Sequence, residues 1–139
     1  MTLKKTKSLA EVKVGDQLAE LSIPITVTLI NGGAIATRDY FPGHHDKEAA
    51  QALGSPHIFM NILTTNGLVE RYIEDWAGPL AKFKNQKIKL GAPNYPGDTM
   101  TFTGEVIERD EATRSVVLGF QGKNSMGNHV TGTVTVELP

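Results

Sequence analysis

The densest group of titratable side chains lies in residues 38–46, RDYFPGHHD. Pro42 and Gly43 interrupt regular hydrogen bonding there, so we expect a loop, and loops often carry functional groups. Asp39 and His44 stand five residues apart across the Pro-Gly turn and can converge on one water molecule. The carboxylate would orient or deprotonate that water, and the imidazole would exchange a proton near neutral pH. The pattern therefore indicates general acid–base chemistry.

The same residues also have structural explanations. Asp39 is of a type common in turns and helix caps, and the pair His44 and His45 is also typical of a solvated loop. A metal site made of His44, His45 and Asp46 is less favoured, because adjacent histidines on a short loop seldom face one ion. We therefore expect no bound metal. The other two histidines are most simply structural: His57 and His129.

Several function classes are excluded by what the sequence lacks. Without cysteine there are no disulfides, thiolate nucleophiles, iron–sulfur clusters or cysteine-based zinc sites. The sequence has no G-x-x-x-x-G-K phosphate loop, no G-x-G-x-x-G turn and no G-x-S-x-G elbow. The 14 Lys and Arg residues against 15 Asp and Glu residues give a net charge of −1, so we expect no nucleic-acid binding.

The chain of 139 residues is long enough to bury one full core, so we expect a single domain over residues 1–139. Residues 1–15 form a polar lead-in that ends in a turn at Gly15-Asp16. This lead-in has neither an apolar stretch nor a small-residue cleavage site, and no run approaches ~18 apolar residues. We expect a soluble, cytoplasmic protein without a membrane span.

The clearest element is a helix that begins with Ser55 as N-cap and Pro56 at the first helical position, and that stops at Gly78-Pro79. About 22 residues lie between these signals. The first half is apolar on nearly every side, and the second half is amphipathic. A helix that is apolar all round must be enclosed by other elements. We therefore place this helix at the centre of the fold.

The remaining elements are mostly strands. Residues 24–30, PITVTLI, predict an early strand, and residues 47–53 predict a short helix ended by Gly54. Apolar and polar residues alternate along residues 81–90. The apolar positions change from odd to even numbers across Asn85-Gln86, which indicates a bulge. Three more alternating runs follow, around residues 100–106, 116–120 and 130–138. One long helix with a curved antiparallel sheet wrapped around it is an α+β hotdog fold.

With these elements in place, the residues resemble a known family. The segment Asp39 to His44, DYFPGH, resembles the D-x-N-P-x-H signature of MaoC-like, or R-specific, enoyl-CoA hydratases. Residues 95–99, YPGDT, are similar to the P-G-D-T/S turn that precedes a strand in this family. The segments ATRDYFPGHHD, IFMNILT and RYIEDWAGP look like the short MaoC-like subunit of two-subunit hydratases from bacterial steroid side-chain degradation. The resemblance covers about residues 15–138.

The resemblance implies a hotdog fold and the hydration of trans-2-enoyl-CoA thioesters. By motif, Asp39 and His44 would be the pair that binds and activates water. A backbone N–H would stabilise charge on the thioester oxygen, and the family's donor position falls on Ile62, beside Asn61. Both residues are therefore expected to bind substrate. No cofactor is implied, since coenzyme A is part of the substrate. The implied partner is a second MaoC-like subunit, in a heterodimer, a heterotetramer or a homodimer.

The sequence departs from the family pattern at two positions. The signature asparagine is Phe41, and Ile62 stands where many members have glycine. These departures keep a non-catalytic acyl-CoA-binding subunit as one alternative. An acyl-CoA thioesterase is another, and it would need a carboxylate from the central helix, such as Glu70 or Glu74. A lysine row is either a solvated sheet face or a contact for coenzyme A phosphates: Lys82, Lys84, Lys87 and Lys89.

Overall fold

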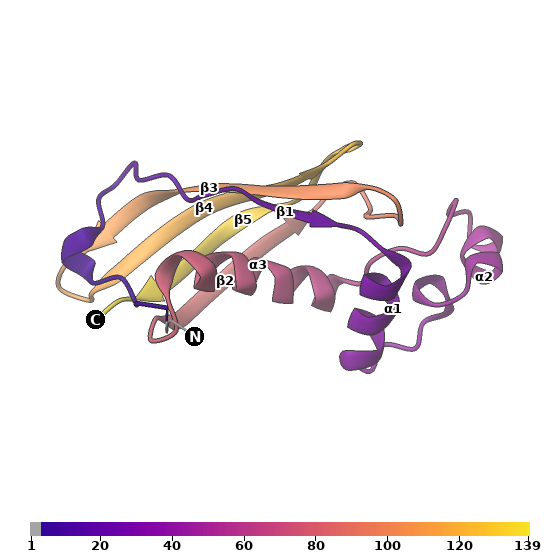
Figure 1. Cartoon of the computed structure of the whole chain (residues 1–139), viewed down its shortest axis with the longest axis horizontal. Helices are drawn as coiled ribbons and strands as arrows, with labels where there is room; N and C mark the ends of the chain where they lie inside the picture. The colour runs from indigo at the N-terminus through magenta and orange to yellow at the C-terminus, as the bar shows by residue number, and fades with distance from the viewer. Residues whose placement is uncertain (1–3) are drawn as a thin grey trace.

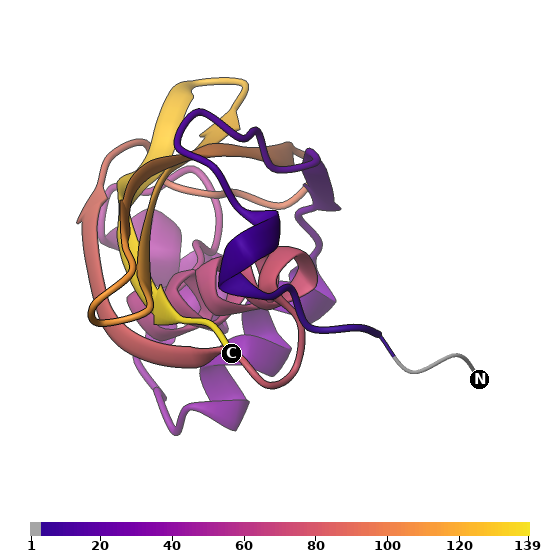
Figure 2. The same cartoon turned by 90° about the vertical axis from the view of Figure 1, so that its left-hand side faces the viewer.

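A computed structural model of the chain describes residues 4–139 (Figure 1). A five-stranded antiparallel sheet with the strand order β1-β3-β4-β5-β2 curls around helix α3, as the end-on view in Figure 2 shows. This is the predicted α+β hotdog arrangement. The strands are β1 (Leu21–Pro24), β2 (Lys82–Leu90), β3 (Thr99–Asp110), β4 (Ser115–Asn124) and β5 (Gly127–Glu137). The helices are α1 (Val27–Ala36), α2 (Lys47–Ala52) and α3 (Ile62–Ala77), with 3₁₀ turns η1 (Leu9–Glu11) and η2 (Pro42–His44).

The core lies between the concave face of the sheet and one face of α3. Alternate residues of β3, β4 and β5 point inward and are buried, as the period-two patterns predicted. From α3, Val69, Tyr72 and Ile73 are buried against them. The ring of Tyr72 stacks on that of Phe102 with 5.0 Å between centroids. Burying such side chains contributes about 1.5–3 kcal/mol each, which fixes α3 against the sheet.

The predicted strand over residues 24–30 is wrong beyond its first residue. β1 ends at Pro24, and α1 begins at Val27. Thr26 caps this helix, since its Oγ1 accepts a hydrogen bond from the backbone N–H of Leu29 at 3.0 Å. Inside the helix Ile30 is fully buried. Because β-propensity is weak and context-dependent, the cap and the burial override the preference of this β-branched run for a strand.

The predicted start of the central helix is also wrong, although its end at Gly78 is confirmed. α3 begins at Ile62 with Asn61 as its N-cap, so residues 55–61 are irregular. Two long-range backbone hydrogen bonds hold this stretch outside the helix: Phe59 N–H donates to Gly43 O at 3.1 Å, and Met60 N–H donates to Asn94 O. The helix start is therefore enclosed on one side only: Thr64 and Thr65 are buried, whereas Ile62 is 49% exposed.

The predictions of a short helix over residues 47–53 and of a bulge in residues 81–90 hold with small shifts. α2 ends at Ala52, and Gly54 follows in the left-handed region with φ +93°. The irregularity of β2 lies between Phe83 and Asn85, one step before the predicted bulge. α1 and α2 gather beyond the N-terminal end of α3, far from the C-terminus (Figure 1). Within residues 4–139, no helix combines the length and the apolar character required for a membrane span.

Candidate active site

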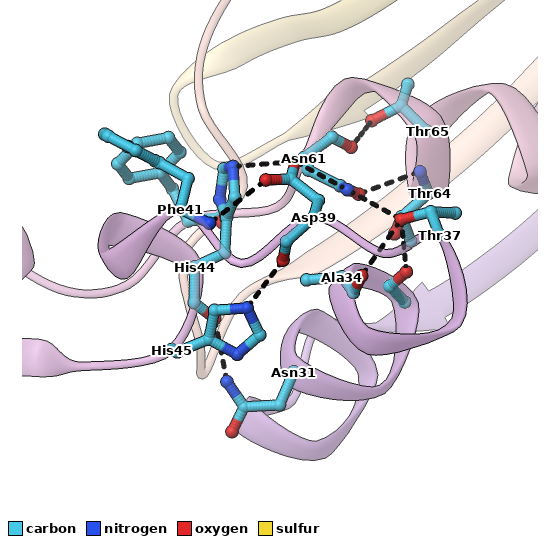
Figure 3. A network of polar contacts seen from close by, with 12 residues as sticks. Asn31, Ala34, Thr37, Asp39, Phe41, His44, His45, Asn61, Thr64 and Thr65 are labelled. Atoms are coloured by element: carbon cyan, nitrogen blue, oxygen red, sulfur yellow. Dashed lines mark hydrogen bonds and ion pairs between the residues drawn. The ribbon is translucent and has the colours of Figure 1, made fainter.

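Asp39 is placed by the way in which α1 ends. The Oγ1 of Thr37, the C-cap, donates to Gly33 O at 2.7 Å, and Asp39 N–H donates to Ala34 O at 2.8 Å. Between them Arg38 adopts a left-handed conformation with φ +57°, which is uncommon for a residue that has a side chain. The chain therefore reverses tightly after α1, and the carboxylate of Asp39 turns toward the start of α3 (Figure 3).

The carboxylate of Asp39 receives two hydrogen bonds that favour its charged form. Asn61 Nδ2 donates to Oδ2 at 3.0 Å, and Phe41 N–H donates to Oδ1 at 3.2 Å. Both bonds hold the pKa of Asp39 below its usual value, and the nearby rings of His44 and His45 act in the same direction. Asp39 is therefore a carboxylate at neutral pH. Its side chain is 28% exposed, so the anion remains within reach of a ligand.

The imidazole of His44 lies beside this carboxylate, with 3.4 Å between His44 Nε2 and Asp39 Oδ2. On its other side, His44 Nδ1 lies 2.6 Å from the backbone carbonyl oxygen of Phe59. A carbonyl oxygen only accepts hydrogen bonds, so Nδ1 must carry the proton. Nε2 is then the nitrogen that faces Asp39, where it can exchange a proton. The ring itself is held by an edge contact with Phe59, whose centroid is 4.8 Å away.

Asn61 connects the start of α3 to the end of α1. Its Oδ1 accepts the backbone N–H of Thr64 at 2.9 Å, which caps the helix. Its Nδ2 donates to Thr37 Oγ1 and to Asp39 Oδ2, each at 3.0 Å. Since the Thr64 N–H requires an acceptor and the Asp39 carboxylate requires a donor, the amide has only one orientation that satisfies all its neighbours.

Ile62, the other predicted substrate-binding residue, occupies the first position of α3. Within residues 4–139, the structure shows no hydrogen-bond acceptor for the backbone N–H of Ile62 or of Leu63. Unpaired N–H groups in the first turn of a helix, together with the helix dipole, attract negative charge. The structure thus brings three features to one end of α3: a carboxylate, a base and free backbone donors.

Comparison with known proteins identifies the family. The profile of the family described as MaoC like domain matches residues 10–128, which is most of the chain. The chain belongs to the MaoC-like family. Family membership places it among hydratases and dehydratases, enzymes that add water to a double bond or remove it. The resemblance stated from the DYFPGH segment is confirmed.

Individual relatives agree with this assignment. The MaoC-like chain is 46% identical over 125 residues to the 3-oxo-4,17-pregnadiene-20-carboxyl-CoA hydratase beta subunit of Mycobacterium tuberculosis, covering 90% of this chain and 95% of that one. A chain of the ChsH1-ChsH2 complex from the same organism is 44% identical with a TM-score of 0.88, over 91% of this chain and 98% of that chain. The R-hydratase PhaJ1 of Pseudomonas aeruginosa shares the fold, with 22% identity, a TM-score of 0.88, and coverage of 96% and 86%.

Other candidate residues of this MaoC-like chain lie apart from the Asp39–His44 pair. Glu70 and Glu74 are exposed on the outer face of α3. In the lysine row, Lys82 and Lys84 form ion pairs with Glu137 at 3.3 and 2.8 Å. Within residues 4–139, no group of three or more potential ligands of the His, Cys, Asp and Glu types is arranged to hold a metal ion.

Sequence patterns missed two contributors to the site. The carbonyl of Phe59 selects the tautomer of His44, but any residue type supplies a carbonyl, so no sequence signal exists. Gly33 is the second, because it lets α1 approach α3 closely. A Cβ added to Gly33 would lie within 2.0 Å of Thr64 Oγ1. The adjacent pair Gly32-Gly33 was the available signal, because glycine costs stability inside a helix.

Gly33→Ala is expected to destabilise the protein, because the new methyl group would push α1 away from α3 and pull Thr37 from Asn61. Overpacking of this kind costs about 1–3 kcal/mol. Gly32→Ala is the matched control, since its Cβ would meet no atom within 4 Å. That variant should gain about 0.5–1 kcal/mol from helix propensity. Urea unfolding of both variants checks the prediction, and equal stabilities would contradict it.

Proposed function

We propose that this chain hydrates the trans-2 double bond of an acyl-CoA thioester, with Asp39 and His44 as the residues that activate water. The observation that carries the proposal is the pair itself: an ionised carboxylate lies 3.4 Å from Nε2 of an imidazole whose other nitrogen donates to Phe59 O. A water molecule beside the pair can donate one hydrogen bond to the carboxylate of Asp39 and the other to Nε2 of His44.

The geometry of the pair suggests one order of steps for the hydration. Asp39 orients the water, and His44 Nε2 removes one proton as the water oxygen forms a bond to C3 of the enoyl group. The electrons of the double bond move toward the thioester, so negative charge develops on its oxygen. The backbone N–H of Ile62 is the proposed donor to that oxygen, worth about 2.7–4 kcal/mol in comparable sites. The imidazolium then returns its proton to C2, while Asp39 stabilises its charge. Atoms and charge balance, and no further cofactor takes part.

An apolar acyl group suits the surroundings of the pair. Phe41 and Ile62 flank it with side chains that are 45% and 49% exposed. Phe41 also lies within 6.4 Å of the ring of Phe59, which extends the apolar surface beside His44. The relative of 46% identity is named for a steroid carboxyl-CoA. We therefore propose a steroid side-chain enoyl-CoA as the substrate.

We further propose that the chain works with a second, larger MaoC-like subunit in a heterodimer or heterotetramer. The relative is a beta subunit, and one similar structure is that of a complex of two named proteins. Around the site, large apolar side chains are exposed on α1 and in the loop after it: Val27, Ile35 and Tyr40. A partner that covers these side chains would remove apolar surface from water. A homodimer is the alternative assembly.

The test follows the loss of enoyl-thioester absorbance with a medium-chain and a steroid-type trans-2-enoyl-CoA. The chain is assayed alone and after co-expression with a candidate MaoC-like partner. Hydration by the wild type supports the proposed reaction, and its dependence on substrate and partner identifies the subclass. Release of free thiol would instead indicate a thioesterase. Ligand binding without turnover in every mixture would indicate a non-catalytic acyl-CoA-binding subunit.

Asn61→Ser separates the two roles of Asn61. Serine also caps helices, so α3 should keep its start, but its short side chain does not reach Asp39. The Asn61 bond is the largest influence that lowers the pKa of Asp39. Its loss should raise that pKa, so activity on the acid side should disappear at a higher pH than in the wild type. A pH–rate profile with an unchanged acid limb would show that Asn61 does not act on Asp39.

A further inference from the structure

A buried histidine outside the proposed catalytic pair joins three parts of the fold. His129, on β5, is 4% exposed, and its Nδ1 lies 2.7 Å from the carbonyl oxygen of Ala92, which follows β2. Its Nε2 lies 2.8 Å from Thr65 Oγ1 in the first turns of α3. The carbonyl of Ala92 requires a donor, so Nδ1 carries the proton and Nε2 accepts the hydroxyl proton of Thr65. Burial also lowers the pKa of His129, which keeps the ring neutral.

The first arm of this network leads to Asp39. Thr65 lies four residues after Asn61, and its backbone N–H donates to the backbone carbonyl of Asn61 at 3.3 Å, while its hydroxyl proton goes to His129. A hydroxyl held by His129 therefore fixes the helical turn that starts at Asn61. The Asn61 side chain then donates to Asp39 Oδ2. Figure 3 shows Thr65, Asn61 and Asp39 along one line of contacts.

The second arm leads to His44. The segment that His129 holds through Ala92 continues to Asn94, which is fully buried, and Asn94 O accepts the backbone N–H of Met60 at 3.1 Å. The neighbouring residue, Phe59, supplies the carbonyl that accepts His44 Nδ1–H at 2.6 Å. His129 is thus connected to each member of the proposed catalytic pair through a short chain of hydrogen bonds and adjacent residues.

We infer that His129 is a positioning residue for Asp39 and His44, acting through Thr65 on one side and through residues 92–94 on the other. This inference deepens the proposed function and depends on it for its kinetic consequence. The physical reason is geometric. The irregular segment 55–61 has no secondary structure to set its path, and small displacements of a catalytic group are costly, with 1 Å able to cost about 10²-fold in rate.

Thr65→Val is the main test, because valine keeps the shape of threonine and removes the hydroxyl. We expect kcat to fall about tenfold or more while KM changes little, and we expect Thr65→Ser to restore kcat because it restores the hydroxyl. His129→Asn is the second variant. Its amide can still donate to the Ala92 carbonyl from the place of Nδ1, but it cannot reach Thr65. It should resemble Thr65→Val if the Thr65 arm carries the effect.

A readout without turnover separates this inference from the proposed function. In ¹⁵N-histidine NMR spectra, the Nε2 signal of His44 reports the Asp39 carboxylate that lies 3.4 Å away, and it should shift or broaden in Thr65→Val and return in Thr65→Ser. If the wild type fails to hydrate enoyl-CoA, the proposed function fails, and this signal alone decides the inference. An unchanged signal overturns it, as does an unchanged kcat in an active protein. If neither Thr65→Val nor His129→Asn folds, His129 is a purely structural residue and the inference is also overturned.

Discussion

Asp39→Asn is expected to reduce kcat by about 10²- to 10⁴-fold, the range that a positioned acid–base group contributes. The substitution keeps the size of the side chain and removes its charge. Asp39 accepts hydrogen bonds from Asn61 Nδ2 and Phe41 N–H on separate oxygens. An amide has one oxygen, so its NH₂ group would face one of these donors. The substitution would also leave the imidazolium that His44 forms in the proposed reaction without its counter-ion.

The matched control for this experiment is Asp46→Asn. Asp46 belongs to the same loop and caps α2, with its Oδ1 accepting the Ala49 N–H at 3.1 Å. Asparagine caps helices about as well as aspartate, so this variant should keep both its stability and its activity. Both variants are measured by enoyl-thioester absorbance with the wild-type protein alongside. A similar loss in the two variants would assign the effect to loop charge in general and would refute a specific role for Asp39.

His44→Asn is expected to reduce kcat by about 10²-fold or more. The Nδ2 of asparagine lies near the place of the imidazole Nδ1, so the variant can still donate to the carbonyl of Phe59. It has no atom in the place of Nε2, and therefore no base beside Asp39. Because the ring of His44 is buried among aromatic side chains, some stability will be lost as well. Activity is therefore compared at a temperature where far-UV circular dichroism shows the variant to be folded.

His57→Asn serves as the control for His44→Asn. His57 lies on the irregular segment before α3, and its Nδ1 accepts the N–H of the next residue, Ile58, at 2.8 Å. Among residues 4–139, no hydrogen bond or ion pair joins its side chain to the proposed pair, so its replacement should leave kcat near the wild-type value. A folded His44→Asn variant with wild-type turnover would remove His44 from the mechanism, whatever the result for Asp39.

The sheet could be predicted from the sequence because its patterns are long and strict. Apolar residues alternate along 100–106, 116–120 and 130–138, and the alternating burial within β3, β4 and β5 follows these runs. α1 was mispredicted because its β-branched start is local information, whereas the burial of Ile30 depends on the rest of the fold. The start of α3 was misplaced because Ser55-Pro56 and Asn61 are both acceptable caps, and long-range backbone bonds decide between them.

The candidate site was predictable in its side chains and not in its backbone. The spacing of Asp39 and His44 across a Pro-Gly turn indicated that they meet, and in the structure they do. Asn61 and Ile62 came from the family resemblance, and they lie at the end of α3 that faces the pair. The tautomer of His44 depends on a carbonyl of Phe59, 15 residues away. Carbonyl positions follow from the path of the chain and have no residue type to reveal them.

The placement of α1 and α2 beyond the end of α3 has a consequence for local unfolding. These helices and the loops between them lie outside the sheet, and among their residues only Ile30, Ala34 and Ala50 are buried apolar side chains. A region with so little buried apolar surface opens at a lower free energy than the strands do. Amide hydrogen exchange should therefore be faster around residues 31–52 than in β3 to β5. The proposed catalytic pair sits in this region, so a partner subunit that covers α1 would protect activity against heat by suppressing its local opening.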